Sequence, residues 1–288
     1  MKTGKLIVQP MGGLANRIRV LAYCFQLSMY SHADMVCRWA VNNELYAPFD
    51  SLFQSVPFKI TNVYGKQWLQ TYQRKWYKRL ISKIKRCIHG IDVWLPYDYV
   101  EDALKDGTEK ERGALTERIK VALLQGQTVY IATGAWLGTV TNISYLQPVE
   151  SIRKRIKENT SVFEKGHCYG LLIRRTDNTW SIEHSPIELF EHKIEEIISK
   201  DKKVKFYLAT DDAETAQHLY SKYGDCIVYR EKELSRTSES GIREAVIDMW
   251  LLGNMDEIYG SYWSSFSEVA SWIHHKPLYC ISDADTAK

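Results

Sequence analysis

The stretch that most constrains the fold is residues 171–178, Leu-Leu-Ile-Arg-Arg-Thr-Asp-Asn. Three consecutive aliphatic residues indicate a buried strand, because a sheet covered on both faces needs short apolar runs. Arg174 and Arg175 follow at the carboxyl end of that strand, the edge where open α/β sheets bind ligands. Their planar donor groups match phosphate oxygens, so the pattern indicates a phosphorylated ligand. The alternative is that both arginines pair with nearby acids at the surface.

Strands and helices are predicted to alternate regularly after Tyr169. Further strands are expected at 204–209, 226–229, 257–260 and 278–281. One helix should start at Ser185-Pro186-Ile187-Glu188, which has the capping-box pattern with proline at the first helical position. Another should span about 240–252 and be closed by Gly253, and a third should start at Ser264. This order predicts a parallel sheet with helices on both faces.

The N-terminal half begins with a similar pattern. Residues 6–8 predict a strand, and residues 9–17 predict a glycine turn that opens a helix. Gly12, Gly13 and Asn16 are candidate substrate-binding residues, because glycine lets the backbone approach a ligand and a helix start attracts anions. An ordinary tight turn between strand and helix is the alternative. Residues 35–37 and 128–133 predict further strands.

The chain of 288 residues is long enough for two medium domains. We expect an N-terminal Rossmann-like, acceptor-side domain at 1–148 and a C-terminal Rossmann-like, donor-binding domain at 149–288. A helix rich in Lys and Glu, at 149–159, would link them. Two such α/β domains facing a cleft are common in nucleotide-sugar glycosyltransferases.

Composition limits the classes of partner and the compartment. The net charge of +3 is too small for bulk nucleic-acid binding, and the hydrophobic fraction of 45% is typical of a globular protein. The N-terminus has no signal-peptide pattern and no stretch is long and apolar enough to span a membrane. The six cysteines show no metal-ligand spacing. We expect a cytoplasmic protein, with a peripheral position at the inner face of the membrane as an option.

A basic, aromatic segment at 64–91 differs from its surroundings. It has eight Lys and Arg residues and no acid, and Trp68, Tyr72, Trp76 and Leu80 recur every four residues. The spacing predicts an amphipathic helix, which could lie on an anionic membrane or face a polyanion. The alternative is an ordinary helix docked on its own domain with a solvated basic face.

Several of these motifs together resemble one enzyme family. In order and spacing, residues 173–178, 185–188 and 208–212 are similar to the donor-binding half of fucosyltransferases of the core α1,6 and nodulation type. The similarity continues through Arg236, Glu239, Arg243, Ile247-Asp248 and Ser264-Ser265. It covers about residues 169–273, with weaker support from Gly12 to Asn16. The resemblance implies a GT-B-like fold, GDP-fucose as the donor, inversion at the sugar, and no metal or other cofactor.

The resemblance also implies roles for charged residues. Arg174, Arg175 and Arg243 would supply positive charge to the leaving diphosphate, with Arg174 acting in catalysis. Asp248 resembles the acid that binds guanine, because a carboxylate accepts from both the ring N–H and the exocyclic amine. Arg243 and Asp248 lie about 140° apart around a helix, so they should serve different parts of the nucleotide, or one is structural.

Further donor-side positions follow from the same motifs. Ser264 and Ser265 could hold a phosphate at a helix start, with simple capping as the alternative. Asp177 is a substrate-binding candidate. Asp211 and Asp212 are also substrate-binding candidates; they look like a metal-binding pair, but the resemblance implies an organisational or sugar-facing role.

Inverting transfer needs a base near the acceptor hydroxyl. Glu183 occupies the loop where the family places its base, although this loop is one residue shorter, and His184 is a possible substitute. The family usually has histidine at the position of Leu172 and lysine at the position of Asn178, so a base contact and a charge near the diphosphate are missing here.

The leading hypothesis is therefore a transferase with a nucleotide-sugar donor and a glycan or lipid-linked saccharide acceptor. A phosphotransferase or an epimerase is disfavoured, because the sequence has neither a Walker A motif nor a Gly-x-Gly-x-x-Gly turn. A non-enzymatic protein that binds anionic lipid or nucleic acid through residues 64–91 is the alternative.

Overall fold

A computed structural model describes residues 2–64, 80, 83–84, 86–140, 142–163 and 166–283. The chain divides into two compact units. The first comprises Met1–Gln147 and Arg236–Glu239, and the second comprises Pro148–Ser235 and Ser240–Lys288. Most of the basic aromatic segment at 64–91 lies outside the described residues, so its interpretation stays a prediction.

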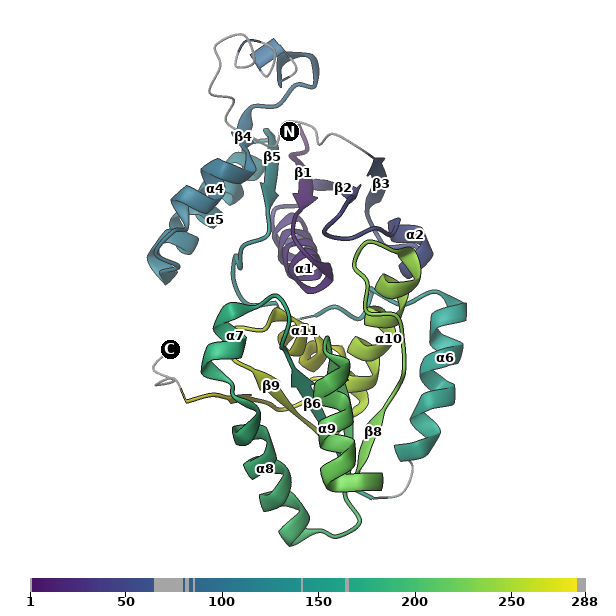
Figure 1. Ribbon diagram of the computed structural model, residues 1–288. Helices are drawn as coiled ribbons and strands as arrows, with labels where there is room; N and C mark the ends of the chain where they lie inside the picture. Colours follow the sequence, from purple (N-terminus) through teal and green to yellow (C-terminus); the bar gives the residue numbers. More distant parts are fainter. Residues whose placement is uncertain are drawn as a thin grey trace. The chain divides into compact units, whose positions relative to one another are not determined.

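The first unit has a parallel sheet with the strand order β3-β2-β1-β5-β4 (Figure 1). Its elements are β1 (Lys5–Pro10), α1 (Leu14–Tyr30), β2 (Asp34–Val41), α2 (Phe49–Leu52), β3 (Lys59–Tyr64), β4 (Val93–Leu95), α4 (Tyr97–Ala103), α5 (Glu109–Leu124) and β5 (Thr128–Thr133). The sequence patterns did not predict β3 and β4. Both are edge strands with partly exposed side chains, so neither has the buried apolar run of a central strand.

The second unit has a parallel sheet with the order β10-β9-β6-β7-β8. Its elements are α6 (Glu150–Thr160), β6 (Cys168–Ile173), α7 (Thr179–His184), α8 (Ile187–Lys200), β7 (Lys205–Thr210), α9 (Ala213–Tyr223), β8 (Ile227–Tyr229), α10 (Glu239–Asn254), β9 (Glu257–Ser261), α11 (Ser265–Ile273) and β10 (Leu278–Ile281), with 3-10 turns at Ser161–Phe163 and Gly224–Cys226. The predicted strand-helix alternation is confirmed.

Helices cover both faces of this second sheet (Figure 1). On one face, Leu171 and Ile173 of β6 pack in a buried cluster with α8 and α9, which contribute Phe190 and Leu219 among others. On the other face, Gly170 lies against Leu252 of α10 so closely that a Cβ would clash with that side chain. The apolar run of β6 is therefore buried on both sides, which is what the sequence predicted.

The prediction that Gly253 closes a helix is wrong. α10 continues to Asn254, and a Cβ at Gly253 would lie 2.9 Å from the carbonyl oxygen of Ala270 in α11. Glycine is present because two helices approach closely there, and not because the chain turns. In the described part of the chain, no helix has the length and apolar character needed to cross a membrane.

Candidate functional site

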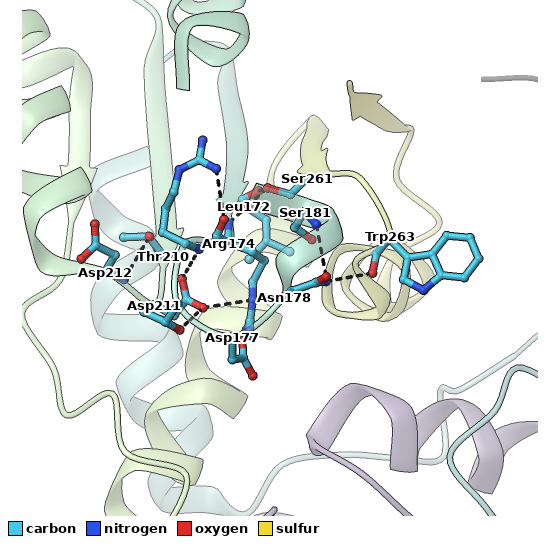
Figure 2. Close-up of polar contacts among 12 residues, drawn as sticks. Leu172, Arg174, Asp177, Asn178, Ser181, Thr210, Asp211, Asp212, Ser261 and Trp263 are labelled. Atoms are coloured by element: carbon cyan, nitrogen blue, oxygen red, sulfur yellow. Dashed lines mark hydrogen bonds and ion pairs between the residues drawn. The ribbon is translucent and has the colours of Figure 1, made fainter. Parts of the chain in front are cut away.

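The candidate site of the second unit lies at the carboxyl edge of its sheet, between β6 and β9, where successive connections begin to run to the opposite side of the sheet. The chain runs from β6 to β7 on one side and later to β9 on the other, so the carboxyl ends of β6 and β9 flank the topological switch point. Ligands bind at such points in open α/β sheets. The two strand ends are joined there, since the Arg174 N–H donates to Ser261 Oγ (3.1 Å), which donates to the Leu172 carbonyl (3.2 Å; Figure 2).

Arg174 pairs with two carboxylates at this edge. Its Nε lies 3.1 Å from Asp211 Oδ2, and a terminal nitrogen bonds Asp177 (Figure 2). Asp211 also accepts from the Arg175 backbone N–H (2.8 Å) and the Thr176 hydroxyl (2.7 Å). Asp211 therefore fixes both the turn after β6 and the direction of Arg174. Arg174 thus pairs with nearby acids, as the surface-pairing alternative predicted for it.

The Arg175 side chain bonds backbone carbonyls instead of acids. Its terminal nitrogens donate to the carbonyl oxygens of Ser185 (2.6 Å) and Arg174 (3.2 Å). Burial lowers the pKa of Arg175, and the nearby acids Glu188 and Asp211 oppose that shift. These bonds and ion pairs use two nitrogens of each guanidinium, so both groups retain N–H donors that a ligand could use.

The adjacent acids Asp211 and Asp212 have different tasks. Asp212 is the N-cap of α9, where its carboxylate accepts from the Thr215 N–H (2.9 Å) and hydroxyl (2.6 Å). The Thr215 hydrogen bond is the main reason why the pKa of Asp212 is lowered. Among the residues described, no three His, Cys, Asp or Glu side chains cluster as ligands of a metal ion would.

The segment that holds Glu183 is a short helix, and the predicted loop is wrong. Asn178, which replaces the lysine of the family pattern, caps α7 by accepting from the Ser181 N–H (3.2 Å). This local bond favours a helical turn over an open loop. Glu183 is exposed on α7, whereas His184 stacks on Trp180 and lies 3.4 Å from Asp283.

The predicted capping box at Ser185 is also wrong. Pro186 is the N-cap of α8, and no side-chain bond caps that helix start. The Ser185 hydroxyl instead donates to the Ile281 carbonyl (2.6 Å) and accepts from the Tyr262 N–H (2.7 Å). The hydroxyl therefore ties the end of α7 to the segments after β9 and β10.

Asp248 lies in a buried, charged network. Its Oδ1 accepts from Tyr207 (2.7 Å) and Arg230 (2.8 Å), and its Oδ2 lies 2.7 Å from Lys232 Nζ. Arg230 also bonds Glu244 (2.8 Å). Burial acts to lower the pKa of Arg230, but Tyr207 and Asp248 outweigh it and raise that pKa.

Sequence reasoning missed Arg230 and Lys232. The available signal was their position, because they follow β8 directly at the carboxyl edge of the sheet. Arg243 lies on another side of α10, where it bonds Ser151 (2.6 Å), so it does not meet Asp248. This agrees with the helical spacing expected from the sequence.

Ser264 and Ser265 mark the start of α11. Ser264 is its N-cap, but its side chain makes no capping bond. The first turn is tightened instead by the Ser267 hydroxyl, which donates to the Ser264 carbonyl (3.1 Å). A Cβ at Gly260 would lie 2.5 Å from that hydroxyl, so the end of β9 needs glycine. The helix start thus lies directly after one of the two strands at the switch point.

The glycine turn of the first unit is organised by Arg17, which sequence reasoning missed. Gly12 has φ +79°, and its N–H donates to Glu44 (3.1 Å). Fully buried Arg17 donates to the Gly12 carbonyl (2.7 Å), to the Ala40 carbonyl and to Asn42 Oδ1 (2.9 Å). This arginine therefore ties the turn to the end of β2.

Of the candidate residues in that turn, Gly13 has open space beside it. A Cβ at Gly13, the N-cap of α1, would meet nothing within 4 Å. Asn16, on the first turn of α1, is half-buried and accepts from Arg19 (3.0 Å). The roles of Gly12, Gly13 and Asn16 in substrate binding stay predictions.

Comparison with known proteins identifies structural neighbours. Neither a family model nor a curated protein sequence matches the chain. Among solved structures, NodZ α-1,6-fucosyltransferase soaked with GDP-fucose is 19% identical, with a TM-score of 0.59 over 94% of this chain and 93% of that one. NodZ from Bradyrhizobium gives 0.60 at 19% identity, over 94% and 92% of the two chains.

More distant fucosyltransferases match as well. A variant of Arabidopsis thaliana FUT1 in complex with GDP gives a TM-score of 0.60 at 13% identity, over 99% of this chain and 71% of that one. POFUT1 in complex with GDP-fucose gives 0.54 at 10% identity, over 98% of each chain. With its two parallel α/β sheets, this chain has the GT-B-like fold of these fucosyltransferases.

Proposed function

We propose that this protein is an inverting, metal-independent glycosyltransferase that transfers fucose from GDP-fucose to a saccharide acceptor. The observation that supports it best is the meeting of Arg174, Arg175 and the strand end before α11 at the switch point of the second sheet. In a fold shared with fucosyltransferases that were solved with GDP or GDP-fucose, this is where a diphosphate would be bound.

The diphosphate would be held by charge and by backbone N–H groups. Arg174 and Arg175 offer their remaining donors, and the start of α11 at Ser264 and Ser265 offers N–H groups without side-chain caps. Such preorganised donors stabilise the negative charge that develops on a leaving diphosphate. Each charge-assisted hydrogen bond contributes about 1.5–3 kcal/mol.

Guanine recognition is assigned to Asp248. Its Oδ1 already accepts two hydrogen bonds, so guanine would approach Oδ2, which Lys232 faces. Lys232 belongs to the segment after β8 that has no regular secondary structure, whereas Tyr207 lies within β7. The rest of the network would then hold the carboxylate in place.

The donor assignment is tested by thermal unfolding with nucleotides. GDP added without magnesium, in the presence of a chelator, should raise the melting temperature, because binding to the native state alone stabilises it. UDP should do so much less, since it cannot donate to Asp248 in the same way. Equal stabilisation by GDP and UDP would contradict the guanine assignment, and stabilisation only with magnesium would contradict metal independence.

The catalytic base is assigned to Glu183. The described contacts leave its carboxylate exposed on α7, whereas His184 is engaged by Trp180 and Asp283. Glu183→Gln should leave stabilisation by GDP unchanged and lower the rate of transfer by a factor of about 10²–10⁴. His184→Asn is the matched control. If His184→Asn abolishes transfer and Glu183→Gln does not, the base is the histidine backed by Asp283.

A further inference from the structure

Four aromatic rings form a continuous strip beside the candidate donor site. Trp180 stacks on His184 (ring centroids 5.5 Å apart), and His184 meets Tyr262 edge-on (5.2 Å). Tyr262 in turn lies 5.9 Å from Trp263. The two tryptophans at its ends are 58% and 61% exposed. Large aromatic side chains exposed together usually mark a binding surface.

The backbone around Trp263 is held in a conformation that this residue type rarely adopts. Trp263 has φ +56°, in the left-handed region that bulky side chains avoid. Asn178 Nδ2 donates to its carbonyl (3.2 Å), and Ser181 Oγ donates to the preceding carbonyl of Tyr262 (2.6 Å). Two hydrogen bonds, one from the N-cap of α7 and one from its first turn, thus hold a strained turn that exposes the indole of Trp263, and such strain is concentrated at functional sites.

The position of the strip relates it to the reaction. α7 carries both Trp180 and the proposed base Glu183, which are three residues apart and so share one side of the helix. Figure 2 shows Trp263 pointing away from Asp211, with Asn178 between them. The strip therefore continues the donor site outward, past the residue that would deprotonate the acceptor.

The charged residues around the aromatic strip indicate which class of ligand it can bind. The segments that build the strip, residues 177–185, 261–268 and 281–283, contain no Lys or Arg. They contain four acids, Asp177, Glu183, Glu268 and Asp283. Away from Arg174 and Arg175, a surface with this charge disfavours nucleic acid and anionic lipid. Carboxylates accept hydrogen bonds from hydroxyl groups, however, and a pyranose presents an apolar C–H face framed by hydroxyls.

We propose that this strip is the acceptor subsite and that it binds an uncharged saccharide, with sugar rings stacked on Trp180 and Trp263. Hydroxyls at the edge of the sugar donate to the surrounding carboxylates. This inference rests on the proposed function, because only a glycosyltransferase needs an acceptor beside Glu183. It adds the chemical class of the acceptor and two residues that position it.

The test measures saccharide binding separately from catalysis. The GDP-bound protein is screened on an array of neutral and anionic oligosaccharides, and the neutral one that binds best becomes the probe. Trp180→Ala and Trp263→Gly should each weaken binding of that probe about tenfold or more, a factor that corresponds to about 1.4 kcal/mol. Glycine is used at position 263 because it adopts positive φ without strain, and retained stabilisation by GDP shows that the variant is folded.

Matched controls separate this inference from the proposed function. Trp136 is 37% exposed in the first unit, and Trp136→Ala should leave binding unchanged. All three variants should retain stabilisation by GDP; if the wild-type protein lacks it, the proposed function itself fails. The subsite proposal is overturned if Trp180→Ala and Trp263→Gly bind the probe as the wild type does. It is also overturned if the wild type binds no neutral saccharide, or prefers anionic ones or lipid vesicles.

Discussion

The turns after β1 and β6 are each built around one arginine, but the two arginines are used differently. Arg17 is fully buried and donates from all three of its nitrogens to the first unit, mainly to neutral carbonyl and amide oxygens. Arg174 is 16% exposed and uses two nitrogens, both toward carboxylates. A guanidinium with every nitrogen engaged fixes the backbone, whereas one with remaining donors can also bind a ligand.

The partners also determine what an incoming anion would meet. Burial lowers the pKa of Arg17 to about 10, with Glu44 opposing, so this arginine stays charged at neutral pH, and its complete burial keeps a ligand away from its remaining N–H groups. At Arg174, Asp211 is 17% exposed and holds the turn, while Asp177 is 44% exposed. A diphosphate would therefore displace Asp177 and leave Asp211 in place, because the more exposed partner costs less to move.

The largest expected effect comes from removing Arg17. Arg17→Met removes the side-chain donor from the Gly12 and Ala40 carbonyls, whereas Asn42 keeps two backbone donors, so the free energy of unfolding should fall by about 1–3 kcal/mol for each carbonyl affected. Denaturant unfolding measures it. Arg19→Met is the control, since Arg19 is only partly buried and should cost much less. If the Arg17→Met variant is as stable as the wild type but no longer binds GDP, the comparison is wrong, because Arg17 would then bind the ligand and would not stabilise the fold.

Removing Arg174 should affect binding more than stability. Arg174→Met should weaken GDP binding by about 1.5–3 kcal/mol, the contribution of a charge-assisted hydrogen bond. The free energy of unfolding should change by no more than about 1 kcal/mol, because the two ion pairs of Arg174 are partly exposed to solvent in the wild-type protein. Titration calorimetry and denaturant unfolding measure the two quantities.

The control for Arg174 is Arg153→Met, which removes an exposed ion pair with Glu150 on α6 and should change neither quantity. If Arg174→Met destabilises the protein as much as Arg17→Met and leaves GDP affinity unchanged, both arginines are structural. The surface-pairing interpretation would then hold for the second unit as well.

The sequence was sufficient to predict the strands that are buried on both faces. β6, β7 and β5 have short apolar runs, and the residue at which each run stops indicates where the strand ends. Because parallel strands end at one edge, Arg174 and Asp211 could be expected to lie close together, and the structure places them in contact.

Other parts of the site depend on contacts between distant residues and could not be predicted this way. Ser185 has the sequence of a helix cap, but its hydroxyl bonds Ile281 and Tyr262, which are far along the chain. The exposure of Trp180 and Trp263 has no local signal either, since tryptophan side chains are on average largely buried in proteins. Only the assembled turn shows that both face solvent.

The two units should also differ in their response to acid. In the second unit, burial acts to raise the pKa of Glu244, but hydrogen bonds from Arg155 and Arg230 outweigh it and lower that pKa. In the first unit, burial raises the pKa of Glu101, with Thr133 opposing. A lowered carboxyl pKa stabilises the fold above its ordinary value of about 4.3, and this contribution is lost as the pH falls through the folded-state value. A raised pKa does the opposite, because its penalty at neutral pH is relieved on acidification.

Glutamine variants separate these two effects, which are the smallest expected here. At neutral pH, Glu244→Gln should lower the free energy of unfolding by about 1 kcal/mol, because Arg155 and Arg230 lose a charged acceptor. The loss should shrink as the pH falls below about 4.3, where this carboxyl is protonated in the unfolded chain, and should disappear below its lowered folded-state pKa. Glu101→Gln should instead raise stability slightly at neutral pH, and its gain should also disappear on acidification. Denaturant unfolding across this pH range measures both. If the two variants change stability in the same direction, the electrostatic contrast between the units is wrong, and Glu244 is held by packing and not by its arginines.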